Sequence, residues 1–167
     1  SPMSRGLGDV YKRQQTNWQL FLKDNNLVNP RLISWINEDQ SLIKRLSKKY
    51  GEISLKLISE KICNHYDEQI SDIELEGNLR KIFLSSTREV VYAESFFSNS
   101  VIKKFNKFSA LGDEALGNYL FSLEEIDKLE TYTAEYVFDN LVYTGRKCIY
   151  SLSNEKFSVI EVFLFNE

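Results

Sequence analysis

The chain has 167 residues, of which 43% are hydrophobic and 27% are charged, and its formal net charge is -3. This composition is typical of one globular domain with a hydrophobic core and argues against disorder. The lysines are scattered along the chain and form no basic stripe, so we expect no nucleic-acid partner. No apolar stretch approaches the roughly 20 residues that span a bilayer, and we expect a cytoplasmic protein without membrane contact.

The first fourteen residues, SPMSRGLGDVYKRQ, show neither helical nor strand periodicity. They look like the translated adapter sequence that is found at the ends of metagenomic reading frames. We predict that residues 1–14 are adventitious or disordered and that residues 15–167 form a single domain.

Residues with metal-binding or nucleophilic chemistry are scarce in this sequence. The chain has one histidine, His65, and two cysteines, Cys63 and Cys148, without a CxxC spacing. A chain with a single histidine excludes most kinds of metal site and every catalytic arrangement that needs a second histidine. We therefore expect no metal site.

The first fifty residues have the spacing of short amphipathic helices. The first predicted helix covers residues 16–24. The second begins with Asn29 as its N-cap and Pro30 at its first helical position. The third begins after Ser41 and stops at Gly51.

From residue 52 onward the period changes to the alternation that is typical of strands. The acidic stretch 66–78 reads as a loop, a helical segment follows Ser98, and SLEE at 122–125 reads as a helix-starting capping box. The last two strands turn at Ser153 and Asn154. We predict an α+β fold with a single six-stranded antiparallel sheet and with helices at the N-terminus and in a central insertion. The six predicted strands cover residues 52–65, 78–86, 89–97, 129–138, 145–152 and 156–165.

Two opposite charges lie inside strand-like apolar runs, Arg80 in NLRKIFL and Glu161 in FSVIEVFLF. Because side chains alternate between the faces of a strand, Arg80 shares its face with Ile82 and Leu84. Glu161 likewise shares its face with aliphatic and aromatic side chains. We predict that both charges point into an interior, where an ion costs several kcal/mol, roughly, unless it is paired, hydrogen-bonded or matched to a ligand.

These two side chains together suit a pocket for a small hydroxy acid. An arginine holds a carboxylate through two parallel hydrogen bonds and so orients the bound molecule. A glutamate among apolar neighbours, unless a cation compensates for its burial, is suited to hydroxyl binding or proton abstraction. The main chain at Leu116 and Gly117 is bare enough to donate hydrogen bonds. The alternative is that Arg80 and Glu161 pair with each other inside the sheet.

Five short segments occur in an order and spacing that can be compared with known families. They are WINEDQSLIKRL at 35–46, LRKIFL at 79–84 followed by YAESFFSNSVI, ALGNYLF at 115–121, GRK at 145–147 and VIEVFLF at 159–165. In this order and spacing they resemble the chorismate lyase family. The similarity covers essentially everything from residue 16 to residue 167.

The resemblance implies a monomeric enzyme, without metal or organic cofactor, that converts chorismate to 4-hydroxybenzoate and pyruvate, the first step of ubiquinone biosynthesis. By position, Arg80 matches the family's arginine at the ring carboxylate, and Glu161 matches its glutamate at the ring hydroxyl. These two are the expected catalytic residues. Leu42 matches a helical flap position, and Leu116 matches the position whose backbone amide meets the carboxylate. The expected substrate-binding residues are therefore Leu42, Arg80, Leu116 and Glu161.

One position departs from the family pattern. Glu94 stands where the family usually has an arginine near the enolpyruvyl carboxylate of the substrate, so a second cation is missing there. Arg146 or Lys147 substitutes for it if either side chain reaches the same pocket. Otherwise these two residues form an ordinary solvated face beside a turn.

Two other functions stay open on the sequence alone. The same fold serves as the effector-sensing domain of some bacterial transcription regulators, so non-catalytic binding of a small aromatic acid is one of them. Against it, only about three short helices precede the sheet here, and none is a basic recognition helix. The other is a degenerate lyase that binds 4-hydroxybenzoate but turns over poorly, as Glu94 suggests.

Overall fold

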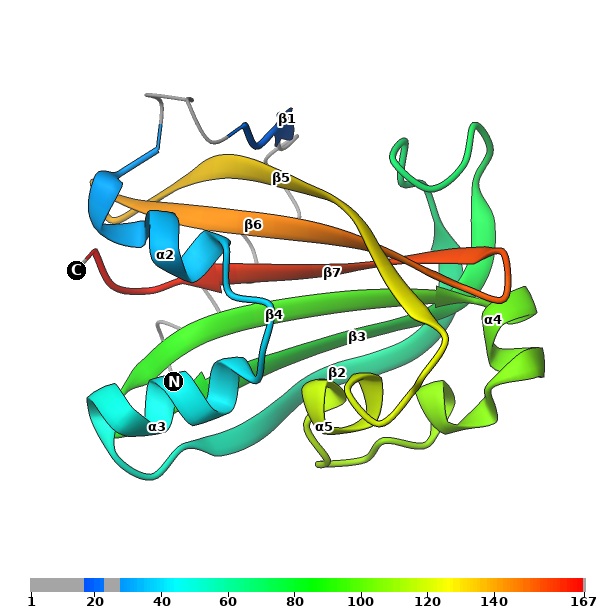
Figure 1. Ribbon diagram of the computed structural model, residues 1–167, viewed down its shortest axis with the longest axis horizontal. Coiled ribbons are helices and arrows are strands. Elements are labelled where there is room, and N and C mark those ends of the chain that lie inside the picture. The colour runs from blue at the N-terminus through cyan, green and yellow to red at the C-terminus, as the bar shows by residue number, and fades with distance from the viewer. Residues whose placement is uncertain (1–16, 23–27, 167) are drawn as a thin grey trace.

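A computed structural model of the chain describes residues 17–22 and 28–166. At its centre lies one sheet with the strand order β1-β5-β6-β7-β4-β3-β2 (Figure 1). All neighbouring strands are antiparallel. The α+β class with one antiparallel sheet is therefore confirmed. The strands are β1 (Gln19–Leu20), β2 (Ser54–His65), β3 (Leu75–Ser85), β4 (Glu89–Ser98), β5 (Ile126–Phe138), β6 (Leu141–Leu152) and β7 (Glu155–Phe163).

The described part of the sheet has seven strands, not the predicted six, and β1 lies where the sequence predicted a helix. In residues 17–22 of the predicted helix 16–24, the chain pairs with β5, and the Phe21 N–H donates to the Thr131 carbonyl at 2.8 Å. An edge strand offers unpaired backbone groups to any extended neighbour, whereas a nine-residue helix is marginal on its own. The helix prediction was wrong for this reason. The prediction for residues 1–14 lies outside the described residues.

The other two N-terminal helices begin and end where the sequence predicted. The Asn29 side chain accepts a hydrogen bond from the Arg31 N–H, and the Ser41 side chain accepts one from the Lys44 N–H. Gly51 ends the last helix at φ 84°, a backbone conformation that glycine adopts without steric cost. These elements are the 3-10 helix η1 (Pro30–Leu32), α2 (Ile33–Ile36) and α3 (Leu42–Tyr50).

The central insertion after β4 is also helical, but several strands begin earlier than predicted: β5 begins at Ile126 and not at 129, and β6 begins at Leu141 and not at 145. Strand β3 already begins at Leu75, inside the stretch 66–78 that was predicted as a loop. SLEE at 122–125 starts no helix: the Ser122 hydroxyl donates backward to the Tyr119 carbonyl at 2.6 Å, and strand β5 begins at Ile126. The helices of the insertion are α4 (Asn99–Lys104), the 3-10 helix η2 (Asn106–Ser109) and α5 (Leu116–Leu120).

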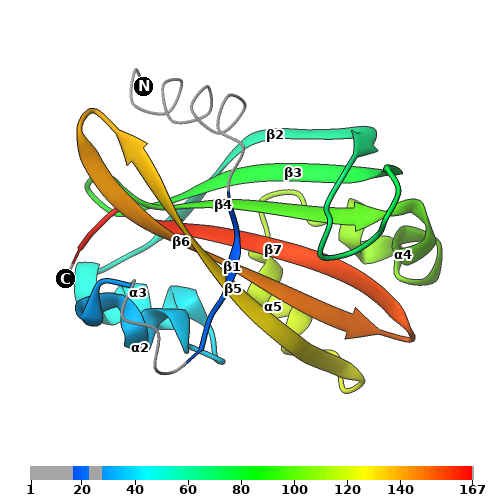
Figure 2. The ribbon, with the colours of Figure 1, turned by 90° about the horizontal axis from the view of Figure 1, so that it is seen from above.

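Helices α2, α3 and α5 lie on one side of the strands, which we call the inner face (Figures 1 and 2). Two clusters of buried side chains pack there. One joins Leu42 of α3 to Ile82 of β3, and the other joins Leu116 of α5 to Val159 of β7. A third cluster, which includes Tyr92, covers the opposite or outer face. Side chains of both inner clusters, among them Leu42 and Leu116, line one cavity.

Candidate active site

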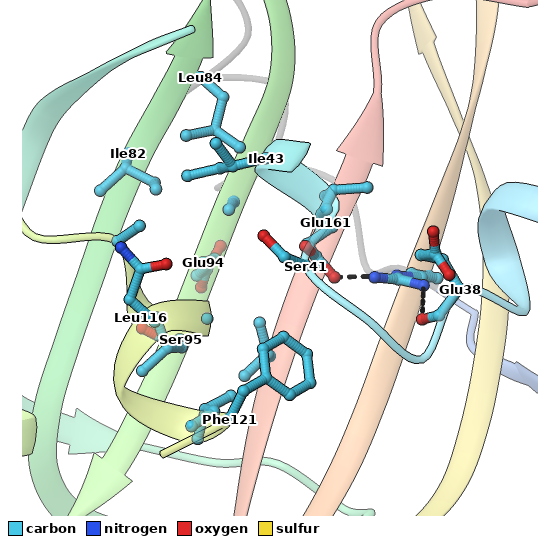
Figure 3. Close-up of a pocket in the computed structure, with 18 of the residues that line it drawn as sticks. Glu38, Ser41, Ile43, Ile82, Leu84, Glu94, Ser95, Leu116, Phe121 and Glu161 are labelled. Atoms are coloured by element: carbon cyan, nitrogen blue, oxygen red, sulfur yellow. Dashed lines mark hydrogen bonds and ion pairs between the residues drawn. The ribbon is translucent and has the colours of Figure 1, made fainter. Parts of the chain in front are cut away.

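A cavity opens on the inner face between α3 and α5. The volume of the cavity that the centre of a water molecule can occupy is about 80 Å³. One water molecule needs roughly 10–15 Å³ by this measure, so the cavity is large enough for a small organic molecule. Figure 3 shows Ser41 on the α3 side, Leu116 and Phe121 on the α5 side, and Ile82 and Leu84 on the strands beneath.

Strand register brings the predicted charges to this cavity. One row across the sheet, from β3 through β4 and β7 to β6, consists of Ile82, Ala93, Glu161 and Arg146. Residues that are paired across antiparallel strands share a face. Arg80 stands two residues before Ile82 in β3 and therefore lies on this same face. Arg80 and Glu161 both line the cavity.

The Arg80 guanidinium is buried, with 2% of the residue exposed, and is held by the segment that precedes α5. Its Nη2 donates to the carbonyls of Gly112 and Glu114, each at 3.0 Å. Its Nε lies 4.0 Å from a carboxylate oxygen of Glu60 and has no hydrogen-bond acceptor among the described residues. Burial lowers the pKa of Arg80 and the Glu60 carboxylate acts against this, but an arginine stays charged throughout. The described hydrogen bonds of the guanidinium thus use only Nη2, and Arg80 lines the cavity.

Glu161 pairs with Arg146 and not with Arg80. The Arg146 Nε donates to Oε1 of Glu161 at 2.8 Å. Among the described residues, Oε2 of Glu161 accepts no hydrogen bond. The alternative of a closed pair between Arg80 and Glu161 is therefore wrong, and the carboxylate has one oxygen left for a ligand.

Arg146 is buried and only 4% exposed, so the expectation of a solvated face at this position is also wrong. Its Nη1 donates to the carbonyls of Trp35 at 2.8 Å, Ile36 at 3.2 Å and Glu38 at 3.0 Å. The last carbonyls of a helix lack donors from the next turn, and here the guanidinium supplies them, although the Trp35 carbonyl also accepts from the Glu38 N–H at 3.2 Å. Burial by itself would lower the pKa of Arg146, but the Glu161 carboxylate, together with weaker contributions from other neighbours, outweighs it and the pKa is raised.

The two leucines that were predicted as site residues border the cavity from its two helical sides. Leu42 is the first residue of α3 and Leu116 is the first residue of α5, and both are buried. Both line the cavity together with Arg80 and Glu161. The structure thus brings all four predicted site residues together.

Lys147 cannot act as the second cation of this cavity. It is paired with Ile160 of β7 and lies on the outer face, because its neighbour Arg146 lies on the inner face. Its Nζ donates to the Asp67 carboxylate at 2.6 Å and to the Gln69 side-chain carbonyl at 2.7 Å. Of the two candidates for that role, Arg146 lines the cavity and Lys147 does not.

Glu94 borders the cavity, but the alternation of side chains along β4 turns its carboxylate to the other face. It alternates with Ala93 and Ser95, which face inward, and it is paired with Lys81 of β3. On the outer face, the Tyr92 hydroxyl donates to its Oε2 at 3.3 Å. The negative charge at position 94 is therefore directed to the outer face.

The arrangement suits a small molecule with an acid group at one end and a polar group at the other. Arg80 offers donors for the acid, Glu161 offers an acceptor, and Ile82, Leu42 and Leu116 provide apolar walls. In the described part of the chain no group of three or more His, Cys, Asp or Glu side chains could hold a metal ion. No helix of that part is long and apolar enough to cross a membrane.

Residues 13–167 match the chorismate lyase family. The chain belongs to this family. It is similar to a protein of Pseudoalteromonas translucida (strain TAC 125) that is named probable chorismate pyruvate-lyase. The two are 26% identical over 150 residues, which cover 78% of this chain and 82% of that protein. The resemblance drawn from the sequence segments is confirmed, and with it the expectation of a chorismate lyase.

On the sequence alone, only Arg80 was considered as a partner of Glu161, although a signal for Arg146 was present. The last hairpin turns at Ser153 and Asn154, both with positive φ, and pairs Leu152 with Glu155. A two-residue turn fixes the register of a hairpin. Six residues back from Leu152 and six forward from Glu155 stand Arg146 and Glu161, which are opposite one another. Extending the predicted turn along both strands would have found the pair.

Proposed function

We propose that this chain converts chorismate to 4-hydroxybenzoate and pyruvate in the cavity between α3 and α5. One observation carries the proposal: in a member of the chorismate lyase family, Arg80 and Glu161 come from strands far apart in the chain and line one cavity. The resemblance supports a role in the first step of ubiquinone biosynthesis. It also supports a cytoplasmic monomer whose partner is its small-molecule substrate.

In the proposed complex, Arg80 binds the ring carboxylate of the substrate. Its described hydrogen bonds use only Nη2, so the other donors of the guanidinium are available to a carboxylate. The backbone amide of Leu116 meets the same carboxylate, and Leu42 covers the ring from the α3 side. Glu161 accepts a hydrogen bond from the ring hydroxyl through the oxygen that Arg146 leaves free.

The reaction is an elimination that makes the ring aromatic. The ring carbon that bears the hydroxyl loses its proton, and the electron pair of that C–H bond forms a new ring double bond. The bond from the adjacent ring carbon to the ether oxygen breaks, and its electron pair leaves with enolpyruvate, which takes up a proton and becomes pyruvate. Because aromatisation drives the reaction, orientation and local electrostatics account for most of the catalysis that is required.

Two observations bear on the alternative that the protein is a degenerate lyase, which Glu94 suggested. The carboxylate of Glu94 is turned to the outer face, so it does not place a negative charge against the substrate. Arg146 brings a second guanidinium to the cavity from β6. Both observations favour an active lyase.

Incubation of the purified protein with chorismate tests the proposal. We expect 4-hydroxybenzoate, measured by chromatography, and pyruvate, measured with lactate dehydrogenase, to appear in equal amounts. Tight binding of 4-hydroxybenzoate without turnover would instead identify the degenerate lyase. If neither turnover nor binding of 4-hydroxybenzoate is observed, the proposal is overturned and the effector-sensing domain remains.

A further inference from the structure

One side chain, Arg146, joins two parts of the site that come from opposite ends of the chain. Its Nε donates to the Glu161 carboxylate in β7, and its Nη1 donates to three carbonyls at the end of α2. The stretch 37–41, in which Asn37, Asp39 and Gln40 are exposed, connects this end of α2 to α3. Gln40, Ser41 and Leu42 then line the cavity. Arg146 therefore lies between the predicted acceptor and the helical segment that covers it.

We propose that Arg146 is a positioning residue that orients Glu161 toward the ligand and holds the α2–α3 segment closed over the cavity. The proposal rests on the function proposed above and assigns a role that the reaction itself does not require of this residue. A guanidinium is planar, and its donors point in fixed directions. When Nε binds Glu161 and Nη1 binds the end of α2, the carboxylate and the helical segment are fixed relative to each other.

The local charges support a coupled arrangement. The carbonyl end of a helix carries partial negative charge, and Glu161 is an acid, so both attract the same cation. Arg146 is buried between them and its ring neighbour is Phe163, whose centre lies 5.8 Å from the guanidinium carbon. Without the guanidinium, the Glu161 carboxylate and the carbonyls of Ile36 and Glu38 would lose a donor at once, while the Trp35 carbonyl would keep the Glu38 N–H at 3.2 Å. Movement of the α2–α3 segment away from the cavity requires either that these bonds break or that Arg146 leaves Glu161.

The coupling has a consequence for ligand release. A ligand in the cavity lies against Gln40, Ser41 and Leu42 of the α2–α3 segment, and movement of this segment disturbs the orientation of Glu161 through Arg146. Retention of the product and orientation of the carboxylate should therefore weaken together when the guanidinium is removed. A residue that only stabilises the fold would change neither property of the folded protein.

The experiment compares the wild-type protein with Arg146→Lys and Arg146→Gln, and uses 4-hydroxybenzoate as the probe. Lysine keeps the charge but cannot bind Glu161 and the end of α2 through a rigid fork. We expect both variants to release 4-hydroxybenzoate at least about tenfold faster and to bind it correspondingly more weakly, the range for a lost hydrogen bond to a charged group. We also expect kcat with chorismate to fall in both, because Glu161 is no longer held.

Lys147→Met is the matched control. It breaks a buried ion pair in the next residue of the same strand, but on the outer face. It should lower stability while it leaves the release rate and kcat unchanged. Thermal unfolding identifies the folded fraction of each variant, so that a loss of folded protein is not read as a loss of binding.

The outcomes separate this inference from the proposed function. If the wild-type protein neither turns over chorismate nor binds 4-hydroxybenzoate, the proposed function fails. If it does both, and the Arg146 variants keep the wild-type release rate and kcat, the inference is overturned. Unchanged affinity for 4-hydroxybenzoate with weaker binding of chorismate would also overturn it, because Arg146 would then contact only the second carboxylate of the substrate.

Discussion

Arg146 and Lys147 are consecutive residues of β6 and form buried ion pairs on opposite faces of the same sheet. Arg146 binds Glu161 at 2.8 Å on the inner face, and Lys147 binds Asp67 at 2.6 Å on the outer face. Each cation is 4% exposed. In sequence the two are neighbours in a short basic run, but the structure gives them different tasks.

The two pairs differ in what they leave unmatched. Lys147 also donates to Gln69, and Asp67 also accepts from the Gln69 N–H at 3.0 Å, so the outer pair closes the loop between β2 and β3 onto the sheet. The inner pair borders a cavity and leaves one oxygen of Glu161 without a described donor. A buried ion pair can bind a ligand when it borders open space and retains an unmatched atom.

The electrostatic balance of the two cations also differs. Burial lowers the pKa of Lys147, and the nearby Asp67 carboxylate does not fully restore it. For Arg146 the effect of burial is outweighed by Glu161 together with weaker contributions from other neighbours, and the pKa is raised. The surroundings of Arg146 thus favour its charged form, whereas for Lys147 the effect of burial prevails over that of its partners.

The largest effect on activity is expected from Glu161→Gln, which keeps the shape of the side chain and removes its charge. We expect kcat with chorismate to fall by about 100-fold or more, the range that a positioned general base supplies. Steady-state kinetics on the folded variant measures it. Unchanged turnover would exclude a role for Glu161 in taking the proton.

The outer pair should affect stability and not activity. Lys147→Met leaves the Asp67 carboxylate buried without its cation, and we expect the free energy of unfolding to fall by about 3 kcal/mol. Denaturant unfolding measures this loss, and kcat of the folded variant should stay at the wild-type value.

The double variant Lys147→Met with Asp67→Leu removes both charges and should recover most of that stability, since an apolar pair can replace a buried ion pair. A double variant as unstable as the single one would show that the charge left unpaired is not the cause.

A smaller effect is expected at position 94, because its carboxylate lies on the outer face. Glu94→Gln should change kcat/KM by less than about threefold, which is under 1 kcal/mol. A loss above tenfold would mean that the carboxylate acts on the substrate, contrary to its place in the register of β4.

The smallest effect concerns His65 at the end of β2. Burial lowers the pKa of His65 below its usual 6.5, although the carboxylates of Glu94 and Asp67 act against it. Because the folded-state pKa is the lower one, the unfolded chain binds more protons below about pH 6.5, and the free energy of unfolding falls as the pH drops through this window.

We expect His65→Gln to remove this part of the acid sensitivity, an effect of about 1 kcal/mol or less. Urea unfolding at pH 5, 6 and 7 on both proteins measures it. Equal slopes against pH in the two proteins would contradict the assignment.

The strand alternation around Arg80 and Glu161 could be read from the sequence because it depends only on the twofold period of a strand. Local signals also located the caps at Asn29 and Ser41, where a side chain bonds its own helix. These features require no knowledge of distant contacts. The inward direction of both charges was predictable from strand alternation for this reason.

Features that depend on distant partners were not predicted in the same way. Strand β1 exists because the edge of β5 offers backbone groups to it, and nothing within residues 16–24 indicates that edge. The burial of Arg146 depends on the end of α2, 108 or more residues away along the chain. The outward direction of Glu94 was available from its alternation with Ala93, but the resemblance drew attention to the residue type instead.

A crystal structure of the protein with 4-hydroxybenzoate tests the central claim most directly. The account predicts that the carboxylate of the ligand lies within about 3.2 Å of the Arg80 guanidinium and that its hydroxyl lies within the same distance of Glu161. It also predicts that Leu42 and Leu116 contact the ring. A ligand bound outside this cavity, or bound in it without contact to Arg80 and Glu161, would contradict the account.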